Sequence, residues 1–204
     1  MCYNEVMLIN GSRLEGCPVM SLHIGGEIAR VTEPIVDPNS LKIIGFKVEG
    51  KMIRDEVGDI LPIESVREFS RMGMIVDSID EFVHDADIVK IKKVMELNFA
   101  LPGLKVVTRK EIKLGKVLDF TVDTEAWYVQ QIIVQRPPLK AFFDPELTIP
   151  RKQIIEVDDY KVVVKDEHEK VKSKVEKIEA AATFVPNFIN PFREPDFANE
   201  KNTK

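Results

Sequence analysis

Short extended segments separated by turns dominate the pattern of apolar and polar positions. The clearest example runs from Leu114 to Val134, where β-branched and aromatic residues fill two stretches on either side of Asp123-Thr124-Glu125. Such residues favour strands, and a short carboxylate favours a turn because it can accept a hydrogen bond from the backbone two residues on. The pattern predicts a β-hairpin.

A looser version of this hairpin occurs earlier, between Ile24 and Val48, with its turn at Asp37-Pro38-Asn39-Ser40. Pro38 strengthens that turn because its ring fixes φ. Four anchors align the two halves: Leu14–Ser21 with Leu101–Thr108 (shift 87, 101 − 14), Gly26–Ile28 with Gly115–Val117 (shift 89), Val36–Pro38 with Val122–Thr124 (shift 86), and Leu61-Pro62 with Ile149-Pro150 (shift 88). The changing shift indicates loop insertions, with a three-residue expansion at Arg30–Pro34, and the alignment predicts an internal repeat.

After each hairpin, a proline-containing loop leads into further short extended segments. Many short strands favour a small closed or nearly closed barrel over an open sheet, because closure removes exposed edges. We therefore expect a mainly β protein with two small antiparallel barrels in tandem, followed by a C-terminal helix and an extended tail. The expected domains are residues 1–92, 93–166 and, for the helix and tail, 167–204.

The C-terminal segment changes character after Asp166. Residues 167–182 lack glycine and proline and carry an apolar stripe at helical spacing, which predicts a charged amphipathic helix. Beyond it, phenylalanines alternate with three prolines, at Phe184, Phe188, Phe192 and Phe197. Aromatic residues in a segment too rich in proline for regular structure are typical of anchors, which either pack against the protein's own assembly or bind a separate partner.

The overall charge of −5 opposes nucleic-acid binding unless basic residues gather on one face. The two cysteines, Cys2 and Cys17, have no metal-binding spacing, and a chain of this length needs no disulfide for stability, so the simple interpretation is a reducing compartment. The N-terminal residues lack the pattern of a secretory signal, and no stretch approaches the roughly 20 apolar residues of a membrane span. We expect a cytoplasmic protein without a membrane span.

The second half of the repeat carries a pattern of glycines, aspartates and β-forming residues between Leu101 and Asp166: Leu101-x-Gly103, Val106-Val107-Thr108, Leu114-Gly115-Lys116-Val117-x-Asp119, Val122-Asp123 and Ile149-Pro150. This pattern resembles the PRC-barrel family, the module shared by the cytoplasmic part of the photosynthetic reaction centre H subunit and the C-terminal part of a small-subunit ribosome maturation factor. The first half, about Leu14 to Lys92, is a more divergent copy. The resemblance implies about six short antiparallel strands per barrel and a role in binding proteins, and it carries over no catalytic residue.

Candidate catalytic and metal-binding groups have simpler interpretations. Asp119 and Asp123 could form an acid–base pair, but an aspartate that closes a turn or accepts a local backbone bond explains each of them. The acidic segment Asp77–Asp87 lacks the regular oxygen spacing of a calcium loop and contains one histidine, so we interpret it as a solvated loop. We expect no enzyme activity, no cofactor and no bound metal.

Partner-binding residues are expected in a loop and in the tail. Trp127 is interpreted as a barrel-core residue, with Tyr128 pointing outward. The segment Val134–Pro145 contains two prolines and two phenylalanines, which either form an interface or plug one barrel mouth. The predicted partner-binding residues are Arg136, Phe142, Phe143, Phe184, Phe188, Phe192 and Phe197.

The leading hypothesis is a non-enzymatic adaptor that binds a protein partner or associates with itself. An alternative is a factor in ribosome maturation or RNA processing, which would need a basic patch. The candidates for that patch are Arg109, Lys110, Lys113, Lys116, Arg151 and Lys152.

Overall fold

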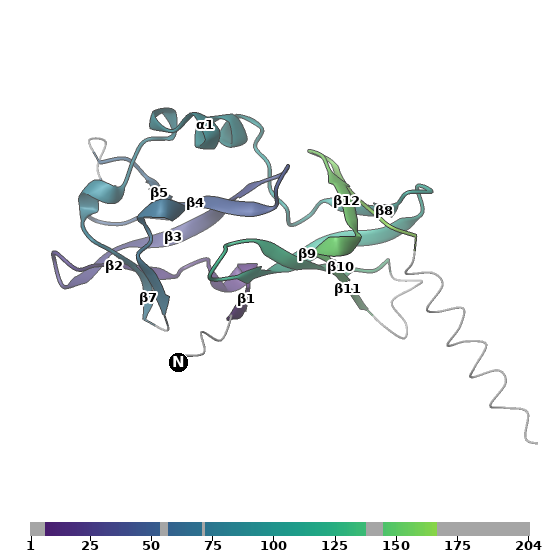
Figure 1. Ribbon diagram of the computed structural model, residues 1–204, viewed down its shortest axis with the longest axis horizontal. Helices are drawn as coiled ribbons and strands as arrows, with labels where there is room; N and C mark the ends of the chain where they lie inside the picture. Colours follow the sequence, from purple (N-terminus) through teal and green to yellow (C-terminus); the bar gives the residue numbers. More distant parts are fainter. Residues whose placement is uncertain (1–6, 54–56, 71, 138–144, 167–204) are drawn as a thin grey trace, which may run out of the picture. The chain divides into compact units, whose positions relative to one another are not determined.

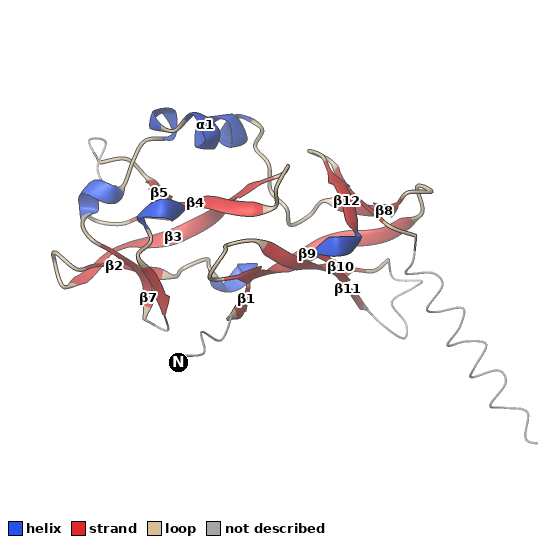
Figure 2. Ribbon diagram, in the orientation of Figure 1, coloured by secondary structure: helices blue, strands red, loops and turns tan. Residues whose placement is uncertain are grey.

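The structure, a computed structural model, describes residues 7–53, 57–70, 72–137 and 145–166. This part of the chain is mainly β, as predicted, with two curled sheets and one short α-helix (Figures 1 and 2). The described residues, 7 to 166 with the gaps just given, belong to one compact unit. The helix and tail predicted for residues 167–204 lie outside the described residues.

The first sheet contains six strands in the order β5-β4-β3-β2-β7-β6. Their bounds are β2 Pro18–Ser21, β3 Gly26–Asp37, β4 Lys42–Glu49, β5 Ile60–Pro62, β6 Glu68–Ser70 and β7 Gly73–Val76. Neighbouring strands are antiparallel except β2 and β7, which run parallel. The helix α1, Val89–Glu96, covers one face of this sheet, where Ile91 and Val94 form a small core with isoleucines of β3, β4 and β5.

The second sheet has the order β11-β10-β9-β8-β13-β12, with β1 added on β9. The bounds are β1 Leu8–Asn10, β8 Lys105–Thr108, β9 Lys113–Asp123, β10 Val129–Gln135, β11 Glu146–Pro150, β12 Ile154–Val157 and β13 Lys161–Val164. The single parallel pair is again the return of a late strand onto the first, here β13 on β8. β1 belongs to the expected domain 1–92 but pairs with β9, so the N-terminal segment crosses to the other half. The division at residue 92 stays a prediction.

The two sheets repeat the same strand order, and even their irregularities correspond. Thr32 in β3 and Leu118 in β9 are both unpaired bulge residues, 86 positions apart (118 − 32), and Ile44 in β4 matches Gln130 in β10 in the same way. A bulge re-aims the residues that follow it. The internal repeat predicted from the sequence is therefore present at the level of register.

One anchor of the sequence alignment was wrong. The register aligns Gly115 with Ala29, a shift of 86 (115 − 29), not with Gly26, and leaves no three-residue expansion at Arg30–Pro34. In both sheets, the backbones of two neighbouring segments approach closely at this point. A Cβ on Gly115 would collide with the Gln135 carbonyl oxygen, whereas in the first sheet Gly50, on the facing side, lies against Ala29. The glycine at this close approach lies in β9 in the second sheet but just after β4 in the first. The alignment of Gly26 with Gly115 was therefore incorrect.

The turns that begin β4 and β10 were predicted correctly. Asp37 accepts a hydrogen bond from the Asn39 N–H at 3.0 Å, and Asp123 accepts one from the Glu125 N–H at 2.9 Å. Each turn ends in a residue with positive φ, Leu41 at 53° and Trp127 at 59°.

These two turns join the sheets. The Ile43 N–H donates to the Trp127 carbonyl at 2.8 Å, and the equivalent Val129 N–H donates to the Leu41 carbonyl at 2.9 Å. The exchange is reciprocal, as in an isologous contact between two copies of one chain. Trp127, 7% exposed, adds edge-to-face contacts to Phe46 and Phe69 of the first sheet, and one core extends through both sheets. The prediction that Trp127 is a core residue is confirmed.

Candidate functional site

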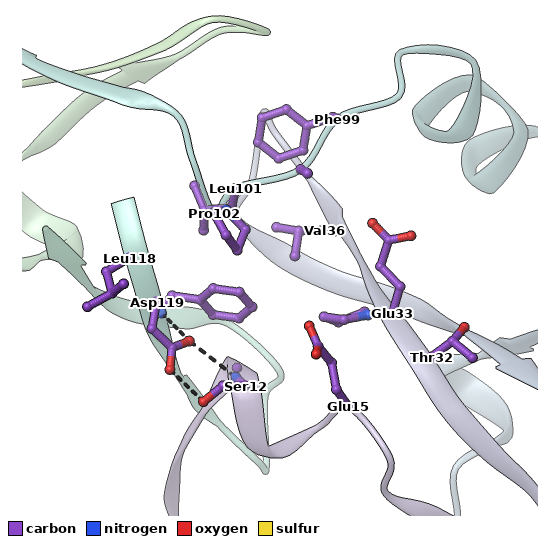
Figure 3. A pocket seen from close by; sticks show the side chains of 14 residues that line it. Ser12, Glu15, Thr32, Glu33, Val36, Phe99, Leu101, Pro102, Leu118 and Asp119 are labelled. Atoms are coloured by element: carbon purple, nitrogen blue, oxygen red, sulfur yellow. Dashed lines mark hydrogen bonds between the residues drawn. The ribbon is translucent and has the colours of Figure 1, made fainter. Parts of the chain in front are cut away.

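A cavity of about 460 Å³ lies where the two repeats meet (Figure 3). Its two walls come from equivalent segments. The β3 wall contains Thr32, Glu33, Pro34 and Val36 and faces the β9 residues Leu118–Phe120, and the segment that precedes β2 faces the one that precedes β8. The remaining lining residues are Gly11, Ser12, Glu15, Phe99, Ala100, Leu101 and Pro102. Sites commonly form at such junctions because two rigid elements supply groups from opposite sides. We therefore take this inter-repeat cavity as the candidate site.

Asp119 secures one side of the inter-repeat cavity. Ser12 donates to this carboxylate from its backbone N–H at 3.2 Å and from its hydroxyl at 2.7 Å, and the Phe120 N–H donates at 2.7 Å (Figure 3). These bonds hold the 3₁₀ turn Gly11–Arg13 against β9. Asp119 therefore accepts the predicted local backbone bond, and it also joins two segments 107 residues apart in sequence.

The opposite side carries Glu33 and Glu15. The Glu33 carboxylate pairs with the Lys47 ammonium at 2.8 Å. Glu15 is exposed and makes no hydrogen bond or ion pair within the described residues. In Figure 3 its carboxylate points toward the space between the side chains of β3 and those of β9.

Apolar groups complete the inter-repeat cavity. Phe99 and Val36 line it together with Phe120, and Leu118 at its edge is 48% exposed. A carboxylate beside apolar walls suits an arginine or lysine side chain, whose stem packs on apolar surface while its charged end meets the carboxylate. The arrangement is therefore that of a binding site for a cationic side chain.

Sequence reasoning missed Ser12 and Glu15, although the repeat contained a signal. The alignment of Leu14–Ser21 with Leu101–Thr108 sets Glu15 opposite Pro102, and both residues line the inter-repeat cavity. If the two segments are known to face each other, the exposed charge of Glu15 is a reason to select it as a candidate site residue. The sequence did not show that the two segments face each other.

The six basic residues proposed for RNA binding separate into different places. Lys113 and Lys116 line a groove of about 540 Å³ on the second sheet. Arg109 and Lys110 are exposed in the turn between β8 and β9, and Lys152 is exposed in the 3₁₀ turn after β11. Arg151 donates to the Ser40 carbonyl at 2.7 Å and lies 4.4 Å from the centre of the Tyr128 ring. Tyr128, expected to point outward, is half-buried, with Lys42 also over its ring at 5.8 Å.

Of the predicted partner-binding residues, Arg136 lines the same groove as Lys113 and Lys116. The others, Phe142, Phe143, Phe184, Phe188, Phe192 and Phe197, lie outside the described residues.

The acidic segment Asp77–Asp87 uses its side chains locally. Asp77 pairs with Arg67, Ser78 caps a 3₁₀ turn, and Asp87 accepts a hydrogen bond from the His84 N–H at 2.9 Å. In the described ranges, no three histidine, cysteine or acidic side chains gather as a metal-binding group.

Comparison with the models of known protein families finds no match for this chain, and comparison with curated proteins finds none either. None of the helices in the described residues has the length and apolar character needed to cross a membrane.

Proposed function

We propose that this protein is a non-enzymatic cytoplasmic adaptor, built from two PRC-barrel-like repeats, that binds a protein partner. The observation that carries the proposal is the inter-repeat cavity, in which the Glu15 carboxylate, without an ion pair among the described residues, stands near the half-buried Phe99 and the exposed Leu118. The β3 and β9 residues of the walls belong to strands of a shared core, so the groups that these strands supply, Leu118 among them, are held in place before binding. Pre-organised groups favour binding because less conformational freedom is lost.

The partner residue that fits is an arginine or lysine next to an apolar side chain. Its cation would meet Glu15, and its stem would lie on Phe99 and Leu118. A cation within hydrogen-bonding distance of a carboxylate contributes more than a neutral pair does, particularly when apolar walls limit access of water. The aromatic tail, Phe184 to Phe197, would add a second contact.

An affinity pull-down from lysate of the source cells, followed by mass spectrometry, tests this proposal. The intact protein is compared with Glu15→Lys and with Glu64→Lys, each sample with and without nuclease. Glu64 is a matched control because it is an exposed carboxylate outside the inter-repeat cavity. We expect a protein partner that survives nuclease, is lost with Glu15→Lys and is retained with Glu64→Lys. Equal capture by the intact protein and both variants would show that the cavity does not bind the partner.

A chain ending at Asp166 tests the contribution of the tail in the same experiment. If the tail is an anchor, this chain captures less partner than the intact protein, while Glu15→Lys reduces capture from either version.

The second candidate function is association with the ribosome or with RNA. Its support is that Lys113 and Lys116, two of the six basic residues, share a groove with Lys105 and Arg136. Capture of ribosomal components that disappear with nuclease and persist in the chain ending at Asp166 would replace the adaptor proposal with this one.

A further inference from the structure

We infer that a groove on the second sheet, lined by Lys105, Lys113, Lys116 and Arg136, binds an acidic extended polypeptide segment. We call it the basic groove. Gly115, Gln135 and Pro137 complete its lining. The inference shares with the proposed function only the premise that the ligand is a polypeptide, and it concerns a different surface from the inter-repeat cavity.

The register of three strands creates the charged row in this groove. Lys105 of β8 pairs with Lys116 of β9, and Lys116 pairs with Gln135 of β10. Directly opposed residues point to the same face of a sheet, and the residues next to them in sequence point to the other. The adjacent Val106 and Val134 are buried in the core, so the row lies on the outer face.

A bulge brings Lys113 into the same groove. Lys113 and Lys116 are three positions apart, so in a regular strand their side chains would point to opposite faces. The register shifts between Val106 and Val107, which leaves Leu114 as an extra, unpaired residue. This extra residue reverses the alternation, and both lysines become exposed on the groove side.

Gly115 provides the floor of the basic groove. Its φ is 157°, and any side chain there would collide with the Gln135 carbonyl oxygen. Because Gly115 opposes Val106 in the register, a side chain there would face the core, and the groove is lined at this point by the Gly115 backbone between the lysine side chains. The aliphatic stems of these lysines and Pro137 form an apolar lining below the charged ends, which can accept apolar side chains of a bound peptide.

The three lysines of the basic groove are not neutralised by carboxylates within the described residues. Lys105, Lys113 and Lys116 make no ion pair within the described residues, and the nearby Glu111 pairs with Lys161 instead, at 3.1 Å. One carboxylate flanks the row, because Glu146 of β11 is opposite Gln135. A cluster of cations on a molecule of net charge −5 attracts a short acidic segment.

The same features favour a peptide over a nucleic acid. A nucleic acid extends beyond a single groove and would meet the acidic remainder of the surface, which repels phosphate. Binding of single-stranded nucleic acid also relies on aromatic side chains that stack on bases, and none of the described lining residues is aromatic.

Fluorescence anisotropy on the full chain tests the inference with three labelled probes. They are a short peptide of alternating glutamate and leucine, the same peptide with lysine in place of glutamate, and an oligouridylate. The double variant Lys113→Glu with Lys116→Glu is compared with Arg109→Glu combined with Lys110→Glu. This control reverses the same number of charges on the same sheet but outside the groove.

We expect the acidic peptide to bind more tightly than the other two probes, and its Kd to rise about tenfold or more in the Lys113/Lys116 variant but much less in the control. An unchanged thermal midpoint in both variants would confirm that they fold. An equal loss of affinity for the acidic peptide in the two variants would indicate non-specific attraction and overturn the inference. Tighter binding of the oligouridylate, lost with Lys113 and Lys116, would overturn it in favour of RNA.

The Glu15→Lys variant separates this inference from the proposed function. It should bind the acidic peptide as the intact protein does, because Glu15 lines the inter-repeat cavity and not the basic groove. If the peptide fails to bind while cavity-dependent partner capture persists, only the inference about the basic groove fails.

Discussion

At the scale of single residues, Asp37 and Asp123 occupy the same turn of the two repeats but have different surroundings. Asp37 is buried, accepts hydrogen bonds from Asn39 and Ser40, and lies 3.3 Å from the Lys90 ammonium. Burial alone would raise the pKa of Asp37, but the hydrogen bonds and Lys90 outweigh burial and hold that pKa below its usual value. Asp123 accepts backbone N–H groups alone and makes no ion pair within the described residues.

The substitution Asp37→Asn should therefore destabilise the protein at neutral pH, by about 1–2 kcal/mol. A lowered pKa means that the folded state favours the ionised carboxylate. The stabilisation is complete above the usual aspartate pKa of about 4 and is lost as pH falls through the lowered folded value. Urea unfolding at a series of pH values should show the difference from the unsubstituted protein shrinking in acid.

Asp123→Asn is the matched control for that measurement. We expect it to reduce the free energy of unfolding at neutral pH by less than Asp37→Asn does, because the turn keeps an oxygen acceptor and loses no ion pair. Equal losses in the two variants would contradict the role assigned to Lys90.

At the scale of elements, α1 shows how one repeat differs from the other. It covers Ile35, Ile44 and Ile60 of the first sheet. The equivalent positions in the second sheet are polar: Thr121 is buried, Gln130 is half-buried and Thr148 is exposed. Because an apolar sheet face must be covered and a polar one need not be, the first repeat requires a helix where the second does not.

Ile91→Ala should remove much of the attachment of α1. Ile91 is 2% exposed and packs among the isoleucines of the sheet, so its truncation should reduce the free energy of unfolding by about 2–4 kcal/mol. Lys92→Ala, at an exposed position of the same helix, should change it by less than about 0.5 kcal/mol. Denaturant unfolding measures both. A loss below about 1 kcal/mol for Ile91→Ala would indicate that the helix contributes little to the fold.

At the scale of the whole molecule, the described residues of the two repeats are arranged like the two subunits of a symmetric dimer, but within one chain. The turns exchange hydrogen bonds reciprocally, one core runs through both sheets, and β1 passes from the first half to the second. Elements that share a core tend to unfold together, because opening either one exposes apolar surface of the other.

We therefore expect a single unfolding transition for both repeats. Trp127 is the chain's only tryptophan, and it contacts Phe46 and Phe69 of the other sheet, so its fluorescence reports on the junction. The midpoint from tryptophan fluorescence should coincide with that from far-UV circular dichroism, which reports on all strands. A fluorescence transition at clearly lower denaturant would show that the repeats separate before they unfold.

Local chemistry determined much of the fold. The turns at Asp37 and Asp123 follow from side-chain bonds within a few residues, and the alternation along β9 and β10 follows from residue preferences, so a mainly β chain with an internal repeat was predictable. The helix α1 was not predicted, although Ile91 and Val94 have helical spacing, because a segment this short carries too few apolar positions to indicate a helix.

Only the tertiary structure decided which residues form the sites. Ser12 meets Asp119, 107 positions away, and the bulge at Leu114 places Lys113 beside Lys116 while Arg151 is engaged elsewhere. The register between strands distant in sequence sets these contacts, and one unpaired residue reverses the face on which a side chain appears. A sequence pattern carries the alternation of a strand, but the partner of that strand and the position of its bulge depend on packing across the whole core.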